Sequence, residues 1–167
     1  MPERVQFVDE NDNPIGGGTR EEAWAKGIYR RISRILLKNE EGEILLQKRS
    51  AMKKTNPNCW TDSASGHVDE GETYETAARR EMLEEIGVRT DLEPLGKFPI
   101  VEQNGDKDLR FFNQCYTGII PKSTPIKIQE EEVSEAKWFA LDEVKALTSD
   151  TPEMFTSAFV ESIKRFY

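Results

Sequence analysis

Residues 66–88, GHVDEGETYETAARREMLEEIGV, join a polar loop to a segment with helical patterning. From residue 73 to residue 86 the apolar residues recur at helical spacing, and Gly87 stands where a left-handed C-terminal cap is expected. Residues one turn apart on a helix lie on the same side, so Glu81, Glu84 and Glu85 share one face. The stretch therefore predicts a loop, a helix with an acidic face, and a second loop.

This acidic face has two interpretations. A row of carboxylates on a helix is often no more than a solvated surface. Acids packed this closely repel one another, however, and a hard cation such as Mg²⁺ or Mn²⁺ is the usual reason to keep them together. Met82, Leu83 and Ile86 are expected to point the opposite way. The residues alone leave both interpretations open.

The same residues match the Nudix box, G-x5-E-x7-R-E-U-x-E-E-x-G-U with U aliphatic, position by position. Met82 stands at an aliphatic position, a departure that the adaptable packing of methionine tolerates. On this match the chain is identified as resembling the Nudix hydrolase superfamily. The resemblance implies an α/β fold of the Nudix type, an α/β/α sandwich with a mixed β-sheet and a loop-helix-loop motif. The matching residues are Gly66, Glu72, Arg80, Glu81, Glu84, Glu85, Gly87 and Val88.

The resemblance also implies a chemistry, the hydrolysis of a diphosphate bond in a nucleoside diphosphate derivative or a similar small organic diphosphate, with Mg²⁺ or Mn²⁺ as cofactor. Metal ions screen the charge of a diphosphate, lower the pKa of a bound water and orient that water for attack. Glu81 is the first candidate for the general base. An acid from residues 130–132 or Glu135 is the second, although that run is equally a polar loop before a strand. The implied metal ligands are Glu81, Glu84 and Glu85, the catalytic candidates are Glu81, Glu85 and Arg80, and the residues that hold the motif in shape are Gly66, Glu72 and Gly87, with a contribution from Arg80.

A wider resemblance, over residues 20–24, 45–54, 57–67 and 132–138, is to the branch of Nudix proteins that includes isopentenyl-diphosphate isomerase. That enzyme uses a cysteine and metal-binding histidines, whereas this chain has Ser65 at the position of the cysteine. Trp24 and Tyr29 stand in the region where the isomerase has its upstream histidines. The missing isomerase residues and the intact box together favour a hydrolase. Isomerase-type activity and a non-catalytic nucleotide-binding module are the alternatives.

The same branch suggests cations that could bind a diphosphate. Arg20, Arg49 and Lys53 or Lys54 lie where it places its diphosphate-binding residues, and the arginine fork suits phosphate well. Each could equally be a surface charge on an acidic protein. His67 has either a structural role in the loop beside the metal or a role as an auxiliary ligand.

Composition limits the remaining function classes. The 167 residues include 23 Lys and Arg against 31 Asp and Glu, a net charge of −8, so nucleic acid is not an expected partner. No apolar run approaches the ~20 residues of a membrane span, and the N-terminus has no secretory pattern. We therefore expect no membrane partner and a cytoplasmic location. The expected partner is a small-molecule diphosphate substrate, and a homodimer stays open because dimers are common in the resembled family.

Cysteine and histidine content narrows the metal chemistry. Cys59 and Cys115 have no C-x-x-C spacing, so neither a disulfide framework nor a thiolate zinc site is expected. The single histidine, His67, excludes an H-E-x-x-H zinc site. Any metal must be held mainly by oxygen atoms.

Along the chain we expect one globular unit, with residues 1–27 as an N-terminal hairpin and connecting segment and residues 28–167 as the Nudix-type domain. Residues 5–8 and Ile15 would flank a polar turn in an edge hairpin. A terminal helix is expected to start at Thr151, with Pro152 at its first position. Further strands are predicted at 29–37, 43–48, 109–120 and 135–139, a further helix at 142–147, and an apolar helical stripe at Phe155, Phe159, Ile163 and Phe166.

Overall fold

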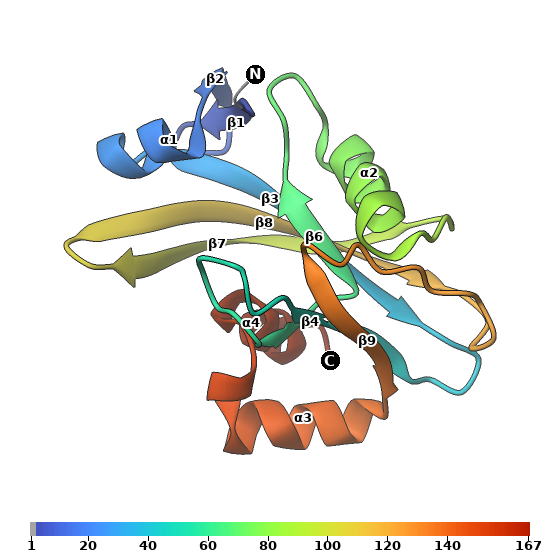
Figure 1. The fold of residues 1–167 in the computed structure, drawn as a ribbon. Coiled ribbons are helices and arrows are strands. Elements are labelled where there is room, and N and C mark those ends of the chain that lie inside the picture. Colours follow the sequence, from blue (N-terminus) through green and yellow to red (C-terminus); the bar gives the residue numbers. More distant parts are fainter. Residues whose placement is uncertain (1–2) are drawn as a thin grey trace.

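Strand β3 (Tyr29–Lys38) is the central strand of the sheet in the computed structural model, which describes residues 3–167. It pairs antiparallel with β1 (Val5–Val8) and with β6 (Ala64–His67), and it pairs parallel with β8 (Lys107–Ile119). Figure 1 shows β3, β6 and β8 crossing the middle of the molecule. The predicted strands at residues 5–8, 29–37 and 109–120 are confirmed.

The remaining strands are β2 (Pro14–Gly18), β4 (Ile44–Arg49), β5 (Trp60–Thr61), β7 (Glu93–Asn104) and β9 (Val133–Phe139). Over the described residues they complete a mixed sheet of nine strands. β4 pairs antiparallel with both β5 and β9. β3 and β4 pair at Lys38 and Ile44, next to the turn that joins them, and β3 then pairs with β6 and β8 while β4 pairs with β5 and β9.

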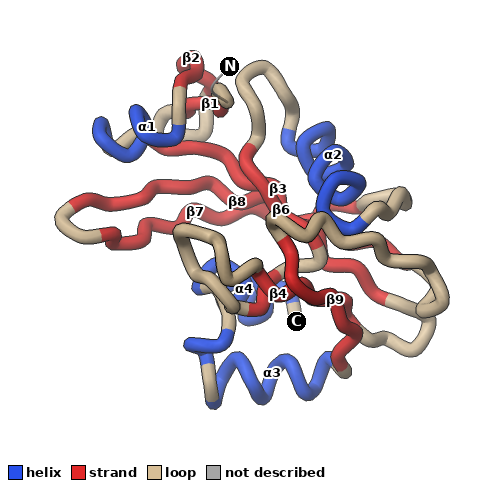
Figure 2. Tube along the Cα trace, in the orientation of Figure 1, coloured by secondary structure: helices blue, strands red, loops and turns tan. Residues whose placement is uncertain are grey.

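Helices cover both faces of this sheet, as expected for an α/β/α sandwich. Ile35 lies in an apolar cluster with residues of α2 (Tyr74–Ile86), whereas Leu36 lies in a second cluster with Phe159 of α4 (Ser157–Phe166). Successive side chains of a strand point to opposite faces, so the two clusters lie on opposite sides of β3. Figure 2 shows helices on either side of the strands.

A buried carboxylate ties the N-terminal hairpin to the rest of the fold. Asp12, in the turn between β1 and β2, is 8% exposed. Its Oδ1 accepts a hydrogen bond from Arg31 Nε at 2.8 Å, and its Oδ2 accepts from Tyr74 Oη at 2.9 Å and from Lys97 Nζ at 2.6 Å. Burial alone would raise the pKa of Asp12, but the hydrogen bonds from Lys97, Arg31 and Tyr74 hold that pKa below its ordinary value. The hairpin is thereby joined to β3, α2 and β7, and the division of the chain at residues 27 and 28 stays a prediction.

The predicted start of the terminal helix is wrong. Helix α4 begins at Ser157, not at Thr151. Thr151 instead closes α3 (Leu141–Asp150), because its hydroxyl donates to a carbonyl of that helix at 3.0 Å, and Pro152–Met154 form a separate 3₁₀ turn. The apolar stripe still packs in the core, where Phe155, Phe159 and Ile163 are all buried.

Three strands, among them the two-residue β5, and one helix lie outside the predicted elements. β6 has the sequence Ala-Ser-Gly-His, which carries no β-branched residue and gives little strand signal. β7 contains two prolines, which it tolerates because it pairs only with β8 and lies at an edge of the described sheet. The short helix α1 (Arg20–Lys26) covers the start of β8. In the described part of the chain, no helix has the length and apolar character needed to cross a membrane.

Candidate active site

Helix α2 holds its acids in place because both of its ends are capped. At the N-terminus, Thr73 Oγ1 accepts a hydrogen bond from the Thr76 N–H at 3.1 Å. At the C-terminus, Gly87 has a left-handed φ of 67° and donates its N–H to the Leu83 carbonyl at 3.0 Å. The predicted helix and its glycine cap are confirmed.

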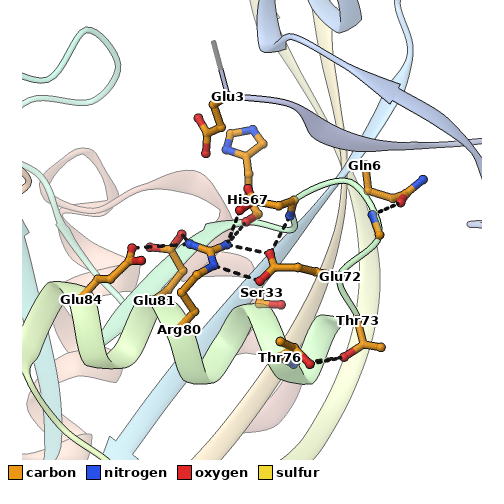
Figure 3. Close-up of polar contacts among 12 residues, drawn as sticks. Glu3, Gln6, Ser33, His67, Glu72, Thr73, Thr76, Arg80, Glu81 and Glu84 are labelled. Carbon is orange, nitrogen blue, oxygen red and sulfur yellow. Dashed lines mark hydrogen bonds and ion pairs between the residues drawn. The ribbon is translucent and has the colours of Figure 1, made fainter. Parts of the chain in front are cut away.

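Arg80 ties this helix to the loop that precedes it (Figure 3). Its Nε and Nη2 donate to the two carboxylate oxygens of Glu72 at 2.9 and 2.8 Å, and Nη2 also donates to the His67 carbonyl at 3.1 Å. Glu72 accepts a further hydrogen bond from the Asp69 N–H at 2.8 Å. Such a bidentate pair fixes both side chains in one geometry. The arrangement supports the predicted role of Arg80 and Glu72 in holding the motif.

Glu85 is buried, with 7% of its surface exposed. Its Oε1 accepts hydrogen bonds from Gln47 Nε2 at 2.8 Å and from the Ser65 N–H at 2.9 Å. Both donors are neutral. Burial, with added repulsion from Glu81, raises the pKa of Glu85 from 4.5 to about 8. The ionised form of Glu85 is therefore unfavourable unless a cation lies beside it.

Glu81 lies one helical turn earlier and packs against Gly66 of β6. A Cβ added to Gly66 would lie 2.2 Å from Glu81 Cδ, so a glycine is needed to leave room for this carboxylate. Glu81 Oε1 accepts a hydrogen bond from Arg80 Nη1 at 2.7 Å. Burial raises the pKa of Glu81 to about 7, although the charge of Arg80 opposes the shift. A carboxyl that titrates near neutral pH is suited to proton transfer.

The third acid, Glu84, has a different environment. Its side chain is 49% exposed, and an oxygen lies 3.5 Å from Arg80 Nη1. Next to it, Leu83 is 41% exposed. Helix α2 rests on the sheet along its buried residues Met82 and Ile86 and leaves Leu83 at its flank, so the predicted direction of Leu83 away from the acids stays a prediction.

The chemistry of these donors shows whether a metal ion fits. Within residues 3–167 no three His, Cys, Asp or Glu side chains converge closely enough to hold a metal, and Arg80 contacts both Glu81 and Glu84 (Figure 3). The partly buried Glu81 and the buried Glu85 nevertheless repel each other as like charges, and carboxylate oxygens are the donors that Mg²⁺ and Mn²⁺ prefer. The residues present therefore fit a divalent cation, while the ligand set of Glu81, Glu84 and Glu85 stays a prediction.

Two of the predicted phosphate-binding cations already have acidic partners. An Nη2 atom of Arg20 lies 2.8 Å from a carboxylate oxygen of Glu3. Lys53 forms an ion pair with Glu132. Both cations contribute to the positive field at His67, so both lie near the start of the box. Their role in binding phosphate stays a prediction.

Of the other two predicted cations, Arg49 is the last residue of β4 and Lys54 lies on the loop that follows it. Arg49 donates from Nη2 to the Thr55 carbonyl at 2.8 Å, and its charge interacts with Glu85. Lys54 is exposed. The structure thus places Arg49 nearer to the acidic pair than Lys54.

His67 lies among cations that the sequence pattern identified only in part. Burial lowers the pKa of His67 well below its ordinary value, and the positive charges of Arg20, Arg30, Arg34 and Lys53 lower it further. The imidazole is therefore neutral at pH 7, and its buried Nε2 has no hydrogen-bond partner among the described residues. Arg30 and Arg34 are absent from the sequence prediction, although their positions two pleats apart on the predicted strand at 29–37 put both on one face.

The acidic run proposed as a second source of the general base lies beside the site. The Gln129 N–H donates to the backbone carbonyl of Glu85 at 3.0 Å, which anchors this loop to α2. Glu132 is close enough to help raise the pKa of Glu85. Glu130, Glu131 and Glu135 are exposed. Glu132 is therefore the member of the run that best fits a catalytic role.

Comparison with known proteins agrees with this geometry. A family model described as a NUDIX domain matches residues 28–158, which is most of the chain. The chain belongs to the NUDIX family. The glycines, acids and arginine of its box have the arrangement described above, and the named relatives of this Nudix protein include hydrolases, so it is assigned to the Nudix hydrolase class of enzymes.

Individual relatives of this Nudix protein cover nearly its full length. It is 32% identical over 164 residues to isopentenyl-diphosphate Delta-isomerase 2 of Photorhabdus laumondii, a match that covers 98% of this chain and 92% of that protein. It is 34% identical over 164 residues to prenyl-diphosphate phosphatase of Methanosarcina mazei, covering 98% and 94%. The crystal structure of DR0079 from Deinococcus radiodurans superposes with a TM-score of 0.81 at 26% identity and 99% coverage of both chains.

Proposed function

We propose that this Nudix protein hydrolyses the diphosphate bond of a small organic diphosphate, such as a nucleoside diphosphate derivative, with Mg²⁺ or Mn²⁺ as cofactor. The observation that carries this proposal is the acidic pair beside β6, formed by the partly buried Glu81 and the buried Glu85. Ionised carboxylates with raised pKa values are stabilised by a bound divalent cation, and metal binding then displaces their protons. The positive charge around His67 supports an anionic substrate.

The acids of α2 and Arg80 have different roles in this proposal. Glu81, Glu84 and Glu85 would hold the metal ion, which would lower the pKa of a water molecule and screen the charge of the diphosphate. Glu81 accepts a proton from the attacking water at a carboxylate oxygen, with Glu132 as the alternative acceptor. Arg80 keeps Glu81 beside β6 and neutralises part of its charge.

Hydrolysis is favoured over isomerisation by the residue at position 65. The isomerase branch has a cysteine there, whereas a serine hydroxyl is a much weaker acid than a thiol. Neither thiol of the chain replaces it, because Cys59 contacts the Glu153 carbonyl and Cys115 lies beside Ser162 of α4. The names of two relatives specify prenyl or isopentenyl diphosphates. Isoprenoid diphosphates therefore belong in a substrate panel beside nucleotides.

The proposal is tested by product release from such a panel, with Mg²⁺ and with Mn²⁺. The panel covers nucleoside diphosphates and triphosphates, nucleotide sugars, dinucleotides and isopentenyl diphosphate. Glu85→Gln is expected to lower turnover by about 100-fold or more, since it removes an electrostatic group from the reacting centre. Glu143→Gln, an exposed acid on α3, is the matched control and is expected to keep full activity.

Three outcomes would contradict the proposal. Metal-dependent turnover that survives Glu85→Gln would show that the acidic pair is not the reacting centre. Binding of panel members without any turnover would favour the non-catalytic module. Conversion of isopentenyl diphosphate to its isomer would favour the isomerase.

A further inference from the structure

Arg30 is a buried arginine that forms no ion pair with a carboxylate within residues 3–167. The residue is 4% exposed, and its guanidinium carbon lies 4.6 Å from the centroid of the Phe111 ring. Within residues 3–167 its Nε has no hydrogen-bond partner, and the guanidinium makes one long hydrogen bond, 3.5 Å from Nη1 to the Arg20 carbonyl. Burying a cation with unsatisfied N–H groups is unfavourable unless an anion compensates for the lost water.

The neighbouring arginines of β3, unlike Arg30, form ion pairs with acids of the fold. Arg31 pairs with Asp12 at 2.8 Å, and Arg34 pairs with the fully buried Asp62 at 2.6 Å. Each of these cations therefore has an acidic partner supplied by the fold. Glu21 acts on Arg30 through its charge alone, without an ion pair among the described residues, which leaves the N–H groups of Arg30 available to an anion from outside the protein.

A second unpartnered polar atom lies next to this arginine. His67 is paired in register with Ile32, which shares a strand face with Arg30, so the His67 side chain lies on that face as well. Its ring centroid is 6.1 Å from that of Phe111, the ring that also lies under Arg30. In Figure 3 the His67 ring points away from α2. The buried, unpartnered Nε2 of His67 and the buried, unpartnered Nε of Arg30 thus belong to one cluster around Phe111.

Strand β6 connects this cluster to the acidic pair. β6 pairs with β3, and among the described strands its other edge is unpaired. Ser65 donates its N–H to Glu85, and Gly66 lies against Glu81. His67 follows Ser65 by two residues, a distance of roughly 7 Å along a strand. The cluster and the acidic pair therefore lie at neighbouring positions of one strand, where both can contact a single small diphosphate.

We propose that Arg30, together with Nε2 of His67, binds an oxyanion of the substrate, the terminal phosphate of an organic diphosphate whose reacting bond lies at Glu81 and Glu85. This inference rests on the proposed function and assigns the orientation of the substrate. Phe111 supports the guanidinium plane from one side, so the N–H groups of Arg30 are held in place before the anion binds.

The test is calorimetric binding of imidodiphosphate, a diphosphate analogue that resists hydrolysis, measured with and without Mg²⁺. Arg30→Met is expected to weaken binding by about 10- to 100-fold, the range for a hydrogen-bonded charged group. Arg30→Lys keeps the charge but loses the planar fork, so it is expected to bind with intermediate affinity and to raise KM more than it lowers kcat. The matched control is Arg110→Met, because Arg110 is a partly exposed arginine that already pairs with Asp108.

Equal binding by wild type and Arg30→Met would overturn the inference, as would a wild type that does not bind the analogue. If Arg30→Met does not fold, the folded Arg30→Lys variant decides, and unchanged affinity and KM in that variant would overturn the inference too. Failure of the proposed function is distinguishable. Wild-type binding that depends on Arg30, without turnover of any diphosphate, would reject the hydrolase and keep the anion site.

Discussion

Asp12 and Glu85 are carboxylates with nearly the same burial and opposite environments. Their exposed fractions are 8% and 7%. Asp12 accepts hydrogen bonds from two cations and a tyrosine, and its pKa is lowered, whereas Glu85 accepts from an amide and a peptide N–H, and its pKa is raised. Burial alone therefore does not determine what a buried acid does. An acid with cations supplied by the fold stabilises the protein, and an acid without them is available to a cation from solution.

Removal of Asp12 is expected to have the largest effect on stability. Asp12→Ala leaves Arg31 and Lys97 without their acid, and breaking a buried pair in this way lowers the free energy of unfolding by about 3–5 kcal/mol. The measurement is urea denaturation. Asp108→Ala is the control, because its pair with Arg110 is partly exposed and is expected to contribute about 0–1 kcal/mol. Equal losses in the two variants would remove the distinction between the Asp12 cluster and a surface pair.

Gly66→Ala is expected to affect turnover more than stability. Its new Cβ would overlap Glu81 Cδ, so Glu81 must move, and a displacement of about 1 Å at a reacting group lowers kcat by about 100-fold. Ser65→Ala is the control, since it keeps the N–H that bonds Glu85, and we expect it to retain turnover. A wild-type kcat in Gly66→Ala would show that the position of Glu81 is not critical. A large loss of kcat in Ser65→Ala would indicate that turnover needs the serine hydroxyl.

The pH dependence of stability should have opposite signs at the two sites. The folded-state pKa of Glu85 is raised from 4.5 to about 8, so in metal-free buffer its contribution becomes progressively unfavourable as the pH rises through that window. Glu85→Gln removes the unfavourable contribution of the buried carboxylate and is expected to raise the free energy of unfolding at pH 8 by about 1–3 kcal/mol. Asp12 has a lowered pKa, so its stabilisation is present above its ordinary value of 3.8 and is lost as the pH falls through the folded value.

Denaturation curves of wild type and Glu85→Gln between pH 5 and pH 8 measure the predicted difference. Addition of Mg²⁺ at pH 8 should stabilise the wild type and leave Glu85→Gln nearly unchanged, because a ligand that binds the folded state raises its stability. A constant difference between the two proteins across the pH range would contradict the raised pKa of Glu85.

The smallest effect is expected at Glu84, whose side chain is half exposed. Glu84→Gln should change the free energy of unfolding by about 0.5 kcal/mol or less, as is usual for surface substitutions. It should still reduce the thermal shift produced by Mg²⁺, because Glu84 is a proposed ligand. A Mg²⁺ shift equal to that of the wild type would remove Glu84 from the ligand set without affecting the roles of Glu81 and Glu85.

The parts of the fold that the sequence predicts well are those encoded by local contacts. Thr73 and Gly87 cap the two ends of α2, and each forms its hydrogen bond with a residue three or four positions away. Both ends of the helix can therefore be predicted from the local sequence. The start of α4 is not, because Thr151 has the side chain of an N-cap but caps the C-terminus of α3 instead. The sequence does not predict β6 for a different reason. Its Gly66 leaves room for the Glu81 side chain, and glycine gives no strand signal.

The candidate site shows the same limit. The spacing of Glu81, Glu84 and Glu85 predicts that they share a face, but not that Gln47 buries one of them, which depends on a contact between residues 38 positions apart. Arg30 resembles any charged residue at the start of a strand. Only the three-dimensional positions of the acids in the described residues show that none of them forms an ion pair with Arg30.

The parallel pairing of β3 with β8 also has a consequence for how the molecule folds. Arg30 pairs in register with Phe111, so this contact joins parts of the chain about eighty residues apart. Pairings of such long range slow folding, and domains dominated by them fold in milliseconds to seconds. A nascent chain that ends before β8 would already contain the whole acidic helix, yet it would lack the aromatic ring on which Arg30 rests. The proposed anion site at Arg30 is therefore expected to form after the acidic helix.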